Sequence, residues 1–338
     1  MSRVAVIGAG GAVGREMLAL LAEEPLVDDA GEPYGAPLAF GSARTRGQTI
    51  PFGTESVRCG VLWEDSFEDV SIALLAAGGD ISREWAPKLV DAGAVVIDNS
   101  SAFRLDPKVP LVVPEINADQ ISTGPGIIAN PNCSTIILLL AVAPLVELGR
   151  FEIHAATYQA VSGAGKAGFE ALTREKSGGE FRAGSPFPFP IDGNLFPLIG
   201  EVDETGVATE EAKMVEESRK ILDQPELSVF VTCARVPVER CHSEAVTLRF
   251  DNPVDLAAAA ERLRSASGVT FVEDPSVPPQ PTDLAGAHDV AVGRLRQPAP
   301  HVLQFWVVGD QLLKGAALNA VQIARSWAAR SATRPSAS

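Results

Sequence analysis

The sequence is short of positive charge. It contains 28 Lys and Arg residues against 43 Asp and Glu residues, which gives a formal net charge of −15 at pH 7. Nucleic acids and anionic membranes are bound by clustered Lys and Arg side chains, so the composition argues against both kinds of partner. A small anionic substrate would have to be attracted by a few local cations.

Long apolar runs and a secretory leader are also missing. The longest apolar stretch, Ile136–Val146, contains Pro144 and is far shorter than the roughly 20 residues that cross a bilayer. The chain runs from Met1 directly into the apolar segment Val4–Ile7, without a basic segment and a long apolar segment before it. We therefore expect a cytoplasmic protein.

Cysteine is scarce, and its spacing is irregular. The four residues form no CxxC pair, so we expect neither a disulfide framework nor a metal site; they are Cys59, Cys133, Cys233 and Cys241. Each thiol is then either reactive or buried and inert. We expect Cys59 and Cys233 to be buried and inert.

What is present is an alternation of short apolar runs and helical patterns in the first part of the chain. The expected strands are Val4–Ile7, Pro37–Phe40, Ile72–Ala76, Val95–Ile97, Leu111–Val113 and Gly126–Ile128. Helices are expected at Arg15–Glu23 and Ser82–Ala92. This order predicts an α/β protein whose N-terminal domain is a Rossmann-like, doubly wound parallel sheet.

The second part alternates less regularly and predicts an α+β domain with a mixed or antiparallel sheet. Its expected strands are Glu152–Val161, Ser228–Val236, Ser243–Phe250 and His301–Val308. Its expected helices are Gly168–Lys176, Thr209–Leu222 and Val254–Ser267, and a last helix runs from Leu313 to about Ala329. At 338 residues the chain is long enough for two domains, each with its own core.

A glycine-rich loop follows the first strand and opens the first helix. It consists of Gly8, Ala9, Gly10, Gly11, Ala12, Val13 and Gly14. Glycines let the backbone approach a pyrophosphate, whose charge is met by N–H groups at the helix N-terminus. The loop therefore predicts a dinucleotide site, and the alternative is a tight β–α turn without a ligand.

The end of the second strand distinguishes between the two nicotinamide cofactors. NAD sites usually carry an acidic residue there, which binds the ribose 2′-hydroxyl. Here the strand is followed by Gly41, Ser42, Ala43 and Arg44, without an acid. A hydroxyl and a guanidinium suit a 2′-phosphate, so we predict NADP; the alternative for Arg44 is a solvated loop charge.

The segment Asn130–Thr135 precedes an apolar helix expected at Ile136–Leu148. A thiol at a helix N-terminus is favoured as the thiolate by the helix dipole and by free N–H groups. Cys133 is therefore the candidate nucleophile.

Several ordered segments resemble the aspartate-semialdehyde dehydrogenase family over almost the whole chain. They are the segment around Cys133, Asp98–Arg104 (DNSSAFR), Tyr158–Gly165 (YQAVSGAG), Arg235–Val238 with His242–Ala245, and Lys314–Asn319 (KGAALN). The resemblance implies NADP-dependent reductive dephosphorylation of L-aspartyl-4-phosphate to L-aspartate 4-semialdehyde through a cysteine thioester, in lysine, threonine and methionine biosynthesis.

The resemblance also implies a role for each matching residue. Cys133 is the nucleophile, His242 the general acid/base and Gln159 the residue that orients the reacting centre. Arg235 binds the substrate carboxylate, Glu210 its amine, and Lys213 and Arg104 the phosphate, with Asn132 in the same site. Glu210 and Lys213 lie three apart on one helix face, where a solvated ion pair is the alternative.

For the cofactor, the resemblance adds Ser162, Gly163 and Asn319. The last helix then returns to the first domain, which gives an NADP-binding domain of residues 1–132 plus 314–338 and a catalytic and dimerisation domain of residues 133–313. The family is dimeric through its second domain, so a homodimer is implied.

Some positions depart from the family pattern, including Gly10, Gly41, Cys241 and the segment Gly309–Leu313. These departures leave two alternatives open. One is a paralogue acting on a related acyl phosphate such as N-acetyl-γ-glutamyl phosphate, against which the pair Asn132-Cys133 counts. The other is a non-catalytic NADP-binding protein.

Overall fold

The structure is a computed structural model that describes residues 3–28, 31–62 and 69–332. Its described residues form two compact units, and each is described by itself. Unit 1 comprises the residues up to Pro131 together with those from Ala316 onward, and unit 2 comprises Asn132–Gly315.

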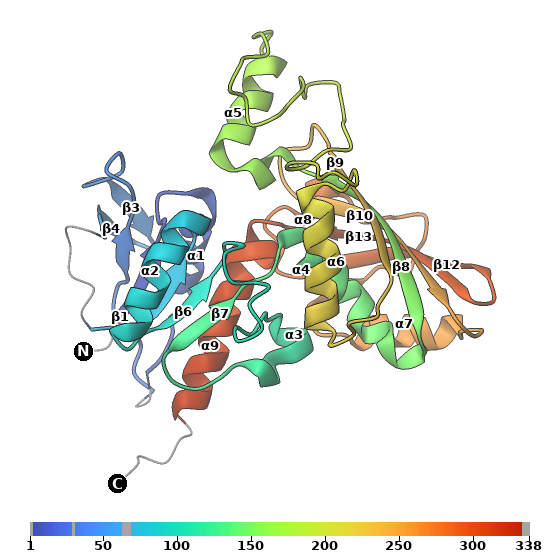
Figure 1. Cartoon of the computed structure of the whole chain (residues 1–338), viewed down its shortest axis with the longest axis horizontal. Helices are drawn as coiled ribbons and strands as arrows, with labels where there is room; N and C mark the ends of the chain where they lie inside the picture. Colours follow the sequence, from blue (N-terminus) through green and yellow to red (C-terminus); the bar gives the residue numbers. More distant parts are fainter. Residues whose placement is uncertain (1–2, 29–30, 63–68, 333–338) are drawn as a thin grey trace. The chain divides into compact units, whose positions relative to one another are not determined.

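Unit 1 is built on a seven-stranded sheet with the strand order β3-β4-β2-β1-β5-β6-β7. Its strands are β1 (Arg3–Ile7), β2 (Leu38–Phe40), β3 (Thr49–Phe52), β4 (Glu55–Gly60), β5 (Val70–Leu75), β6 (Val95–Asp98) and β7 (Gly126–Ala129). Its helices are α1 (Ala12–Glu23), α2 (Gly79–Asp91), α3 (Pro114–Asn117), the 3-10 helix η1 (Ala118–Gln120) and α9 (Leu318–Ala332) (Figure 1). All strand pairs are parallel except β3 with β4.

The core of unit 1 explains why the apolar runs form strands. Residues of β1, β5 and β6 are almost completely buried, as expected for a parallel sheet covered on both faces. Helix α9 contacts α1, α3, β5 and β6, so this last helix packs within unit 1. The predicted Rossmann-like architecture is confirmed.

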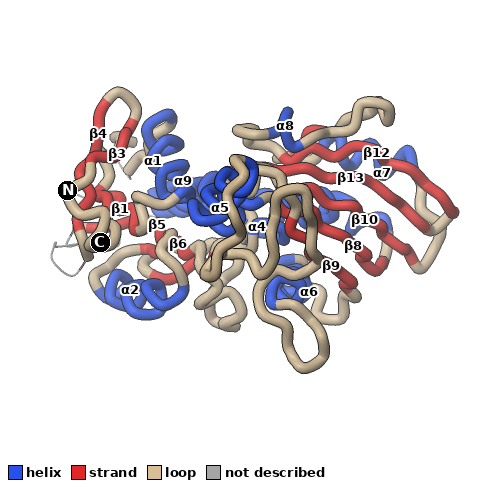
Figure 2. Tube along the Cα trace, turned by 90° about the horizontal axis from the view of Figure 1, so that it is seen from above, coloured by secondary structure: helices blue, strands red, loops and turns tan. Residues whose placement is uncertain are grey.

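Unit 2 contains a six-stranded mixed sheet with the order β11-β12-β13-β10-β8-β9 (Figure 2). Its strands are β8 (Phe151–Gln159), β9 (Val229–Arg235), β10 (His242–Phe250), β11 (Val269–Phe271), β12 (Val290–Ala299) and β13 (Val302–Gly309). Its helices are α4 (Cys133–Val142), η2 (Ala143–Leu148), η3 (Val161–Ala164), α5 (Gly165–Lys176), α6 (Thr209–Ile221), α7 (Leu256–Ser265) and α8 (Pro281–Leu284), and the π-helical turn η4 (Leu313–Ala317) follows β13. The predicted α+β class is confirmed.

Several predicted elements differ from the structure, most of them by one to three residues at an end. Leu111–Val113 is no strand: it makes one parallel bridge, between Leu111 and Ala129, and the chain then turns into α3 at Pro114. The apolar helix begins at Cys133, not Ile136, and becomes a 3-10 helix at Ala143, because Pro144 cannot donate a helical hydrogen bond. The last helix begins as a π-helical turn rather than an α-helix at Leu313.

Candidate active site

Cys133 is the first residue of α4, and its side chain is partly exposed. The preceding Asn132 caps this helix, because its Oδ1 accepts hydrogen bonds from the backbone nitrogens of Ser134 at 2.9 Å and Thr135 at 3.2 Å. The cap fixes the first turn while leaving the sulfur at the positive end of the helix dipole. This placement favours the thiolate form of Cys133.

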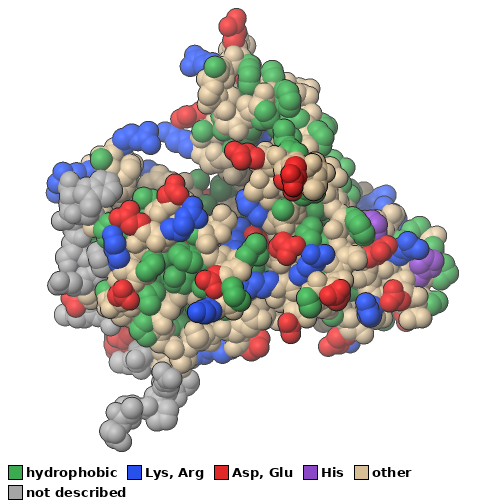
Figure 3. All heavy atoms as spheres, in the orientation of Figure 1, with side chains coloured by type: hydrophobic (Ala, Val, Ile, Leu, Met, Phe, Trp, Pro, Cys, Tyr) green, Lys and Arg blue, Asp and Glu red, His purple; other side chains and the backbone are tan. Residues whose placement is uncertain are grey.

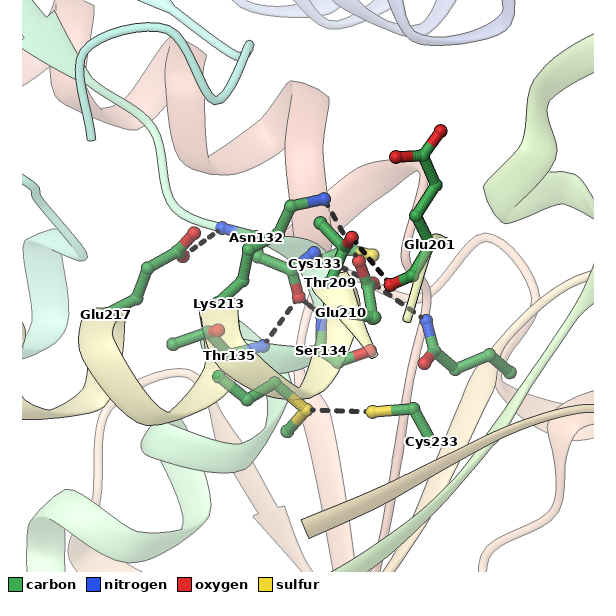
Figure 4. A network of polar contacts seen from close by, with 12 residues as sticks. Asn132, Cys133, Ser134, Thr135, Glu201, Thr209, Glu210, Lys213, Glu217 and Cys233 are labelled. Carbon is green, nitrogen blue, oxygen red and sulfur yellow. Dashed lines mark hydrogen bonds and ion pairs between the residues drawn. The ribbon is translucent and has the colours of Figure 1, made fainter. Parts of the chain in front are cut away.

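Helix α6 holds Asn132 at two points (Figure 4). Glu210 Oε1 accepts from Asn132 Nδ2 at 2.9 Å, and Glu217 Oε2 accepts from the Asn132 backbone nitrogen at 2.6 Å. Glu210 and Glu217 are seven residues apart, which places them on one helix face. Sequence reasoning missed Glu217, although this spacing from Glu210 was available as a signal.

His242 is the first residue of β10, and the structure brings it to the nucleophile. Its Nε2 lies 3.5 Å from Cys133 Sγ, and its Nδ1 accepts a hydrogen bond from the Ala160 backbone nitrogen at 3.0 Å. The ring is completely buried. Burial lowers the pKa of His242 well below 6.5, and the positive charge of Arg235 lowers it further, so the ring is neutral at pH 7.

Gln159 ends β8 beside this pair. Its Nε2 donates to Glu210 Oε1 at 3.1 Å, and its Oε1 accepts from Thr157 Oγ1 at 3.1 Å. The same Nε2 lies 3.5 Å from His242 Nε2. The amide is therefore held in one orientation next to the imidazole.

Arg235 ends β9 and is only 5% exposed. Its Nη1 donates to the Ala160 carbonyl oxygen at 2.6 Å. Burial lowers the pKa of Arg235, while the negative charges of Glu210 and Cys133 oppose that shift. Gly163 leaves room for these groups, because a Cβ there would lie 2.9 Å from Arg235 Nη1 and 3.3 Å from His242 Nε2.

Glu210 and Lys213 form an ion pair of 3.3 Å, but it is no ordinary surface pair, because Glu210 is only 7% exposed. Burial alone would raise the pKa of Glu210. The charge of Lys213 and the hydrogen bonds from Asn132 and Gln159 outweigh burial and hold the pKa below 4.5. The carboxylate is therefore ionised at neutral pH and can face a cation.

Ser162 lies in η3 and forms a hydrogen bond with Gln311, a residue that the sequence did not indicate. Its Oγ accepts a hydrogen bond from Gln311 Nε2, and Gln311 Oε1 accepts from the Cys241 backbone nitrogen at 2.8 Å. Cys241 has φ of 71°, a conformation that side chains rarely adopt. Gln311 thus supports the backbone immediately before His242.

The other cysteines of unit 2 differ from Cys133 in their surroundings. Burial raises the pKa of Cys241 to about 12 and also raises the pKa of Cys233, so both remain thiols. Glu244, two residues after His242, is completely buried, and neither of its carboxyl oxygens has a hydrogen-bond partner among the described residues. Burial raises the pKa of Glu244 well above 4.5.

In unit 1 the glycine-rich loop connects β1 to α1. Gly8 has φ of 89°, and a Cβ on Gly14 would lie 2.3 Å from the Gly8 carbonyl oxygen, so both positions require glycine. Gly11 is the N-cap of α1, and Ala12 and Val13 begin the helix, whose first turn contains no acidic residue. This arrangement would suit an anion such as the pyrophosphate of a dinucleotide.

Ser42 and Arg44 lie in the exposed turn that follows β2. The turn is held by its backbone: the Ser42 carbonyl oxygen accepts from Thr45 Oγ1 at 3.0 Å, and the Arg44 carbonyl oxygen accepts from Gln48 Nε2 at 3.1 Å. Thr45 also faces the loop, since a Cβ on Gly10 would lie 3.2 Å from its methyl group. The Arg44 side chain is exposed.

Arg104 and Asn319 are buried in unit 1. Arg104 Nη2 donates to the Asn99 carbonyl oxygen at 2.8 Å. Asn319 Nδ2 donates to the Val112 carbonyl oxygen at 2.9 Å and to Asn130 Oδ1 at 2.7 Å, which uses both of its hydrogens.

The buried cations are distinct from the surface charge. On the face shown in Figure 3, basic and acidic side chains are interspersed, whereas Arg104 and Arg235 are each less than 10% exposed. Within residues 3–28, 31–62 and 69–332, no three His, Cys, Asp or Glu side chains are placed to hold a metal ion. In the part of the chain that the structure describes, no helix is both long and apolar enough to cross a bilayer.

A dinucleotide-binding fold joined in one chain to a domain with a paired thiol and imidazole defines a class of nicotinamide-dependent oxidoreductases. Comparison with known families makes this more specific. A profile described as "Semialdehyde dehydrogenase, NAD binding domain" matches residues 3–124, and one described as "Semialdehyde dehydrogenase, dimerisation domain" matches residues 142–314. The chain belongs to the semialdehyde dehydrogenase family.

Within this family, the individual relatives are named aspartate-semialdehyde dehydrogenases. The chain is 43% identical over 338 residues to the aspartate-semialdehyde dehydrogenase of Synechocystis, with 96% of this chain and 98% of the relative covered. It is 41% identical over 336 residues to that of Prochlorococcus marinus, with 97% and 96% covered. A solved structure of aspartate semialdehyde dehydrogenase II from Vibrio cholerae, complexed with ASA, superposes with a TM-score of 0.89 at 39% identity and covers 96% of this chain and 98% of its own.

These similarities support the aspartate-semialdehyde dehydrogenase prediction over both alternatives, the paralogue for another acyl phosphate and the non-catalytic protein. The protein is an oxidoreductase with the nucleotide-binding and dimerisation domains of this family.

Proposed function

We propose that the protein converts L-aspartyl-4-phosphate to L-aspartate 4-semialdehyde with NADPH, and the reverse with phosphate and NADP, through a thioester on Cys133. The observation that carries the proposal is the 3.5 Å contact between Cys133 Sγ and His242 Nε2 at the N-terminus of α4. A soft nucleophile at a dipole end beside an imidazole is suited to attack an acyl phosphate.

The chain's own groups account for the covalent steps. The Cys133 thiolate attacks the acyl carbon, the C–S bond forms, and the C–O bond to phosphate breaks with its electron pair leaving on phosphate. NADPH, when bound, supplies a hydride to the thioester carbonyl. The tetrahedral adduct on Cys133 then expels the sulfur as thiolate and releases the aldehyde, with His242 exchanging protons and Gln159 orienting the carbonyl.

Charge complementarity supports the assignment of the substrate groups. Glu210 is an ionised, buried carboxylate that can face the substrate amine. Arg235 offers a planar fork for the α-carboxylate. Lys213 and Arg104 are proposed to bind phosphate, and Asn132 completes the set.

The cofactor preference is proposed to be NADP. The glycine-rich loop would bind the pyrophosphate, and Ser42 and Arg44 the 2′-phosphate, since no acidic residue follows β2 within Gly41–Gly47. Ser162, Gly163 and Asn319 are proposed to lie near the nicotinamide.

We also propose a homodimer formed by the unit 2 sheet. Thr157 and Gln159 are buried under α6, so alternation turns Tyr158 to the opposite face. That face carries Tyr158 at 37% exposure and Phe230 at 55%. A sheet face that gathers exposed aromatic side chains is a candidate for a subunit interface. A cytoplasmic location, where the four free cysteines stay reduced, is part of the same proposal.

An assay of aldehyde oxidation tests the function. Purified protein should reduce NADP in the presence of aspartate semialdehyde, and only when phosphate is added. Activity confined to N-acetylglutamate semialdehyde would support the related paralogue. NADPH binding without turnover of either aldehyde would contradict an enzymatic role.

A further inference from the structure

Arg235 is the residue proposed to bind the substrate carboxylate, but its guanidinium makes only one hydrogen bond within the described parts of the chain. In this bond Nη1 donates to the Ala160 carbonyl oxygen at 2.6 Å. The planar group can still turn about that contact, and it would then present its other N–H groups in different directions. A second contact is needed to fix the plane of the guanidinium.

The ring of Phe187 provides this second contact. Arg235 Cζ lies over the face of the ring, 5.6 Å from the ring centroid. Both residues are only 5% exposed, so water is largely excluded from the stack. Guanidinium groups stack on aromatic rings, and the attraction between the charge and the ring grows when both are removed from water. The ring therefore covers one face of the guanidinium and leaves the N–H edge for a ligand.

The segment that carries Phe187 is fixed to α5 and to the end of β9. The Phe187 ring packs in an apolar cluster with Phe196, and the two ring centroids are 6.1 Å apart. The Ile191 backbone nitrogen donates to Glu175 Oε2 of α5 at 2.7 Å. Phe196 and Arg235 exchange backbone hydrogen bonds of 3.2 and 2.9 Å. The ring and the guanidinium are therefore parts of one packed cluster.

We propose that Phe187 is a positioning residue for the α-carboxylate of the substrate. Its ring holds the Arg235 guanidinium in one plane, so that the N–H edge can pair with both carboxylate oxygens. The role in substrate binding rests on the proposed function, whereas the stack itself does not. Because Phe187 acts through Arg235, it should affect the binding of the semialdehyde and not the bond-making steps at Cys133.

Steady-state kinetics of Phe187→Leu test the proposal, because leucine is apolar but has no aromatic face. We expect KM for aspartate semialdehyde to rise about 5- to 10-fold and kcat to stay within about two-fold of the native value. KM for phosphate should not change. Phe189→Leu on the same segment is the matched control, since Phe189 is 49% exposed and packs against Phe196.

A double-mutant cycle with Arg235→Lys separates positioning from a general disturbance of the fold. Lysine keeps the positive charge but lacks the planar fork that can pair with two oxygens. In the Arg235→Lys background, Phe187→Leu should change KM by less than about two-fold, because no guanidinium plane is left to orient. If Phe187→Leu does not fold, Phe187→Met takes its place, since the flexible methionine side chain fills irregular space.

Equal rises in KM in both backgrounds, or no rise in either, would overturn the positioning role and leave the proposed function standing. Urea unfolding of the same four proteins tests the stack without any substrate, and the two losses of stability should be less than additive. Additive losses would overturn the stack. Less than additive losses in a native protein that does not turn over aspartate semialdehyde would leave the stack standing. That result would overturn the proposed function, and with it the role of Phe187 in substrate binding.

Discussion

The thiol site of unit 2 and the cofactor-preference turn of unit 1 are built in opposite ways. Around Cys133, buried polar side chains hold one another, as Asn132, Gln159 and Glu210 do. In the turn after β2, Ser42 and Arg44 are exposed and are fixed through their backbone. The bond-making groups are thus positioned before any ligand arrives, whereas the 2′-phosphate groups can be ordered by the ligand. Substitutions in the first region should be severe, and those in the second selective.

The strongest test of this contrast is Cys133→Ser. Loss of the nucleophile should lower turnover by at least about four powers of ten, because a serine hydroxyl at this position is not ionised. The affinity for NADP, measured by fluorescence titration, should stay within a few-fold. A variant that keeps more than about 1% of the activity would contradict covalent catalysis through Cys133.

A second substitution tests whether the hydrogen bond between Glu217 and the Asn132 backbone affects the activity of Cys133. Glu217→Leu removes the acceptor for the Asn132 backbone nitrogen, and the resulting shift of Cys133 should lower kcat about 100-fold. Glu216→Leu on the same helix is the matched control, because Glu216 pairs with Arg219 at the surface. Steady-state kinetics that show equal losses in both variants would argue against a positioning role for Glu217.

In the unit 1 turn, Arg44→Glu should weaken NADP binding about 10-fold or more, since it places an anion against the 2′-phosphate. Binding of NAD should hardly change. Turnover at saturating NADP should also stay close to that of the native protein. Lys88→Glu, an exposed charge reversal on α2, is the control. An unchanged preference between the two cofactors, measured by titration, would show that the 2′-phosphate binds elsewhere.

The sheet face proposed for the dimer gives a smaller effect. Phe230→Asp places a charge on this face and should shift the sedimentation coefficient toward that of a monomer at micromolar concentration. Phe181→Asp, another exposed apolar side chain of unit 2, serves as the control. Equal behaviour of the two variants would remove the sheet face as the candidate interface.

The smallest expected effect concerns Glu244, whose pKa in the folded protein is raised by burial. The folded state then binds more protons than the unfolded state above pH 4.5, so stability falls as pH rises through that window, by at most about 1.4 kcal/mol per pH unit. Glu244→Gln should remove this loss and gain stability relative to the native protein from pH 5.5 to pH 8. Urea unfolding at both pH values measures it, and an unaltered pH dependence would contradict a neutral Glu244.

How far the sequence could predict the structure depends on the kind of signal. Buried strands such as β1 and β5 follow from apolar runs, and the glycine loop follows from backbone sterics. Strand β12 was missed, because it contains Gly293, Arg294 and Pro298 and its pairing with β13 is irregular. The hairpin of β3 and β4 was missed because both strands are short, Pro51 lies within β3 and Gly53 follows it directly.

In the candidate site, the reactive side chains were easier to predict than the residues that hydrogen-bond to them or to their backbone. Cys133 and His242 are 109 residues apart, and only the resemblance to a family linked them before the structure did. Ala160 could not be found from its side chain, because it contributes a backbone N–H. Gln311 and Glu217 act through backbone groups of other segments, so their partners depend on tertiary structure.

Helix α6 carries residues that we propose bind the substrate. Its Glu210 and Glu217 also accept hydrogen bonds from Asn132, the residue before the nucleophile. Recognition and reactivity therefore share one rigid part. A substitution in α6 that favours a different amine or phosphate would therefore also shift the Cys133 sulfur. New specificity in this enzyme should therefore come most readily from loops away from α6, and adaptation within the helix should require paired changes.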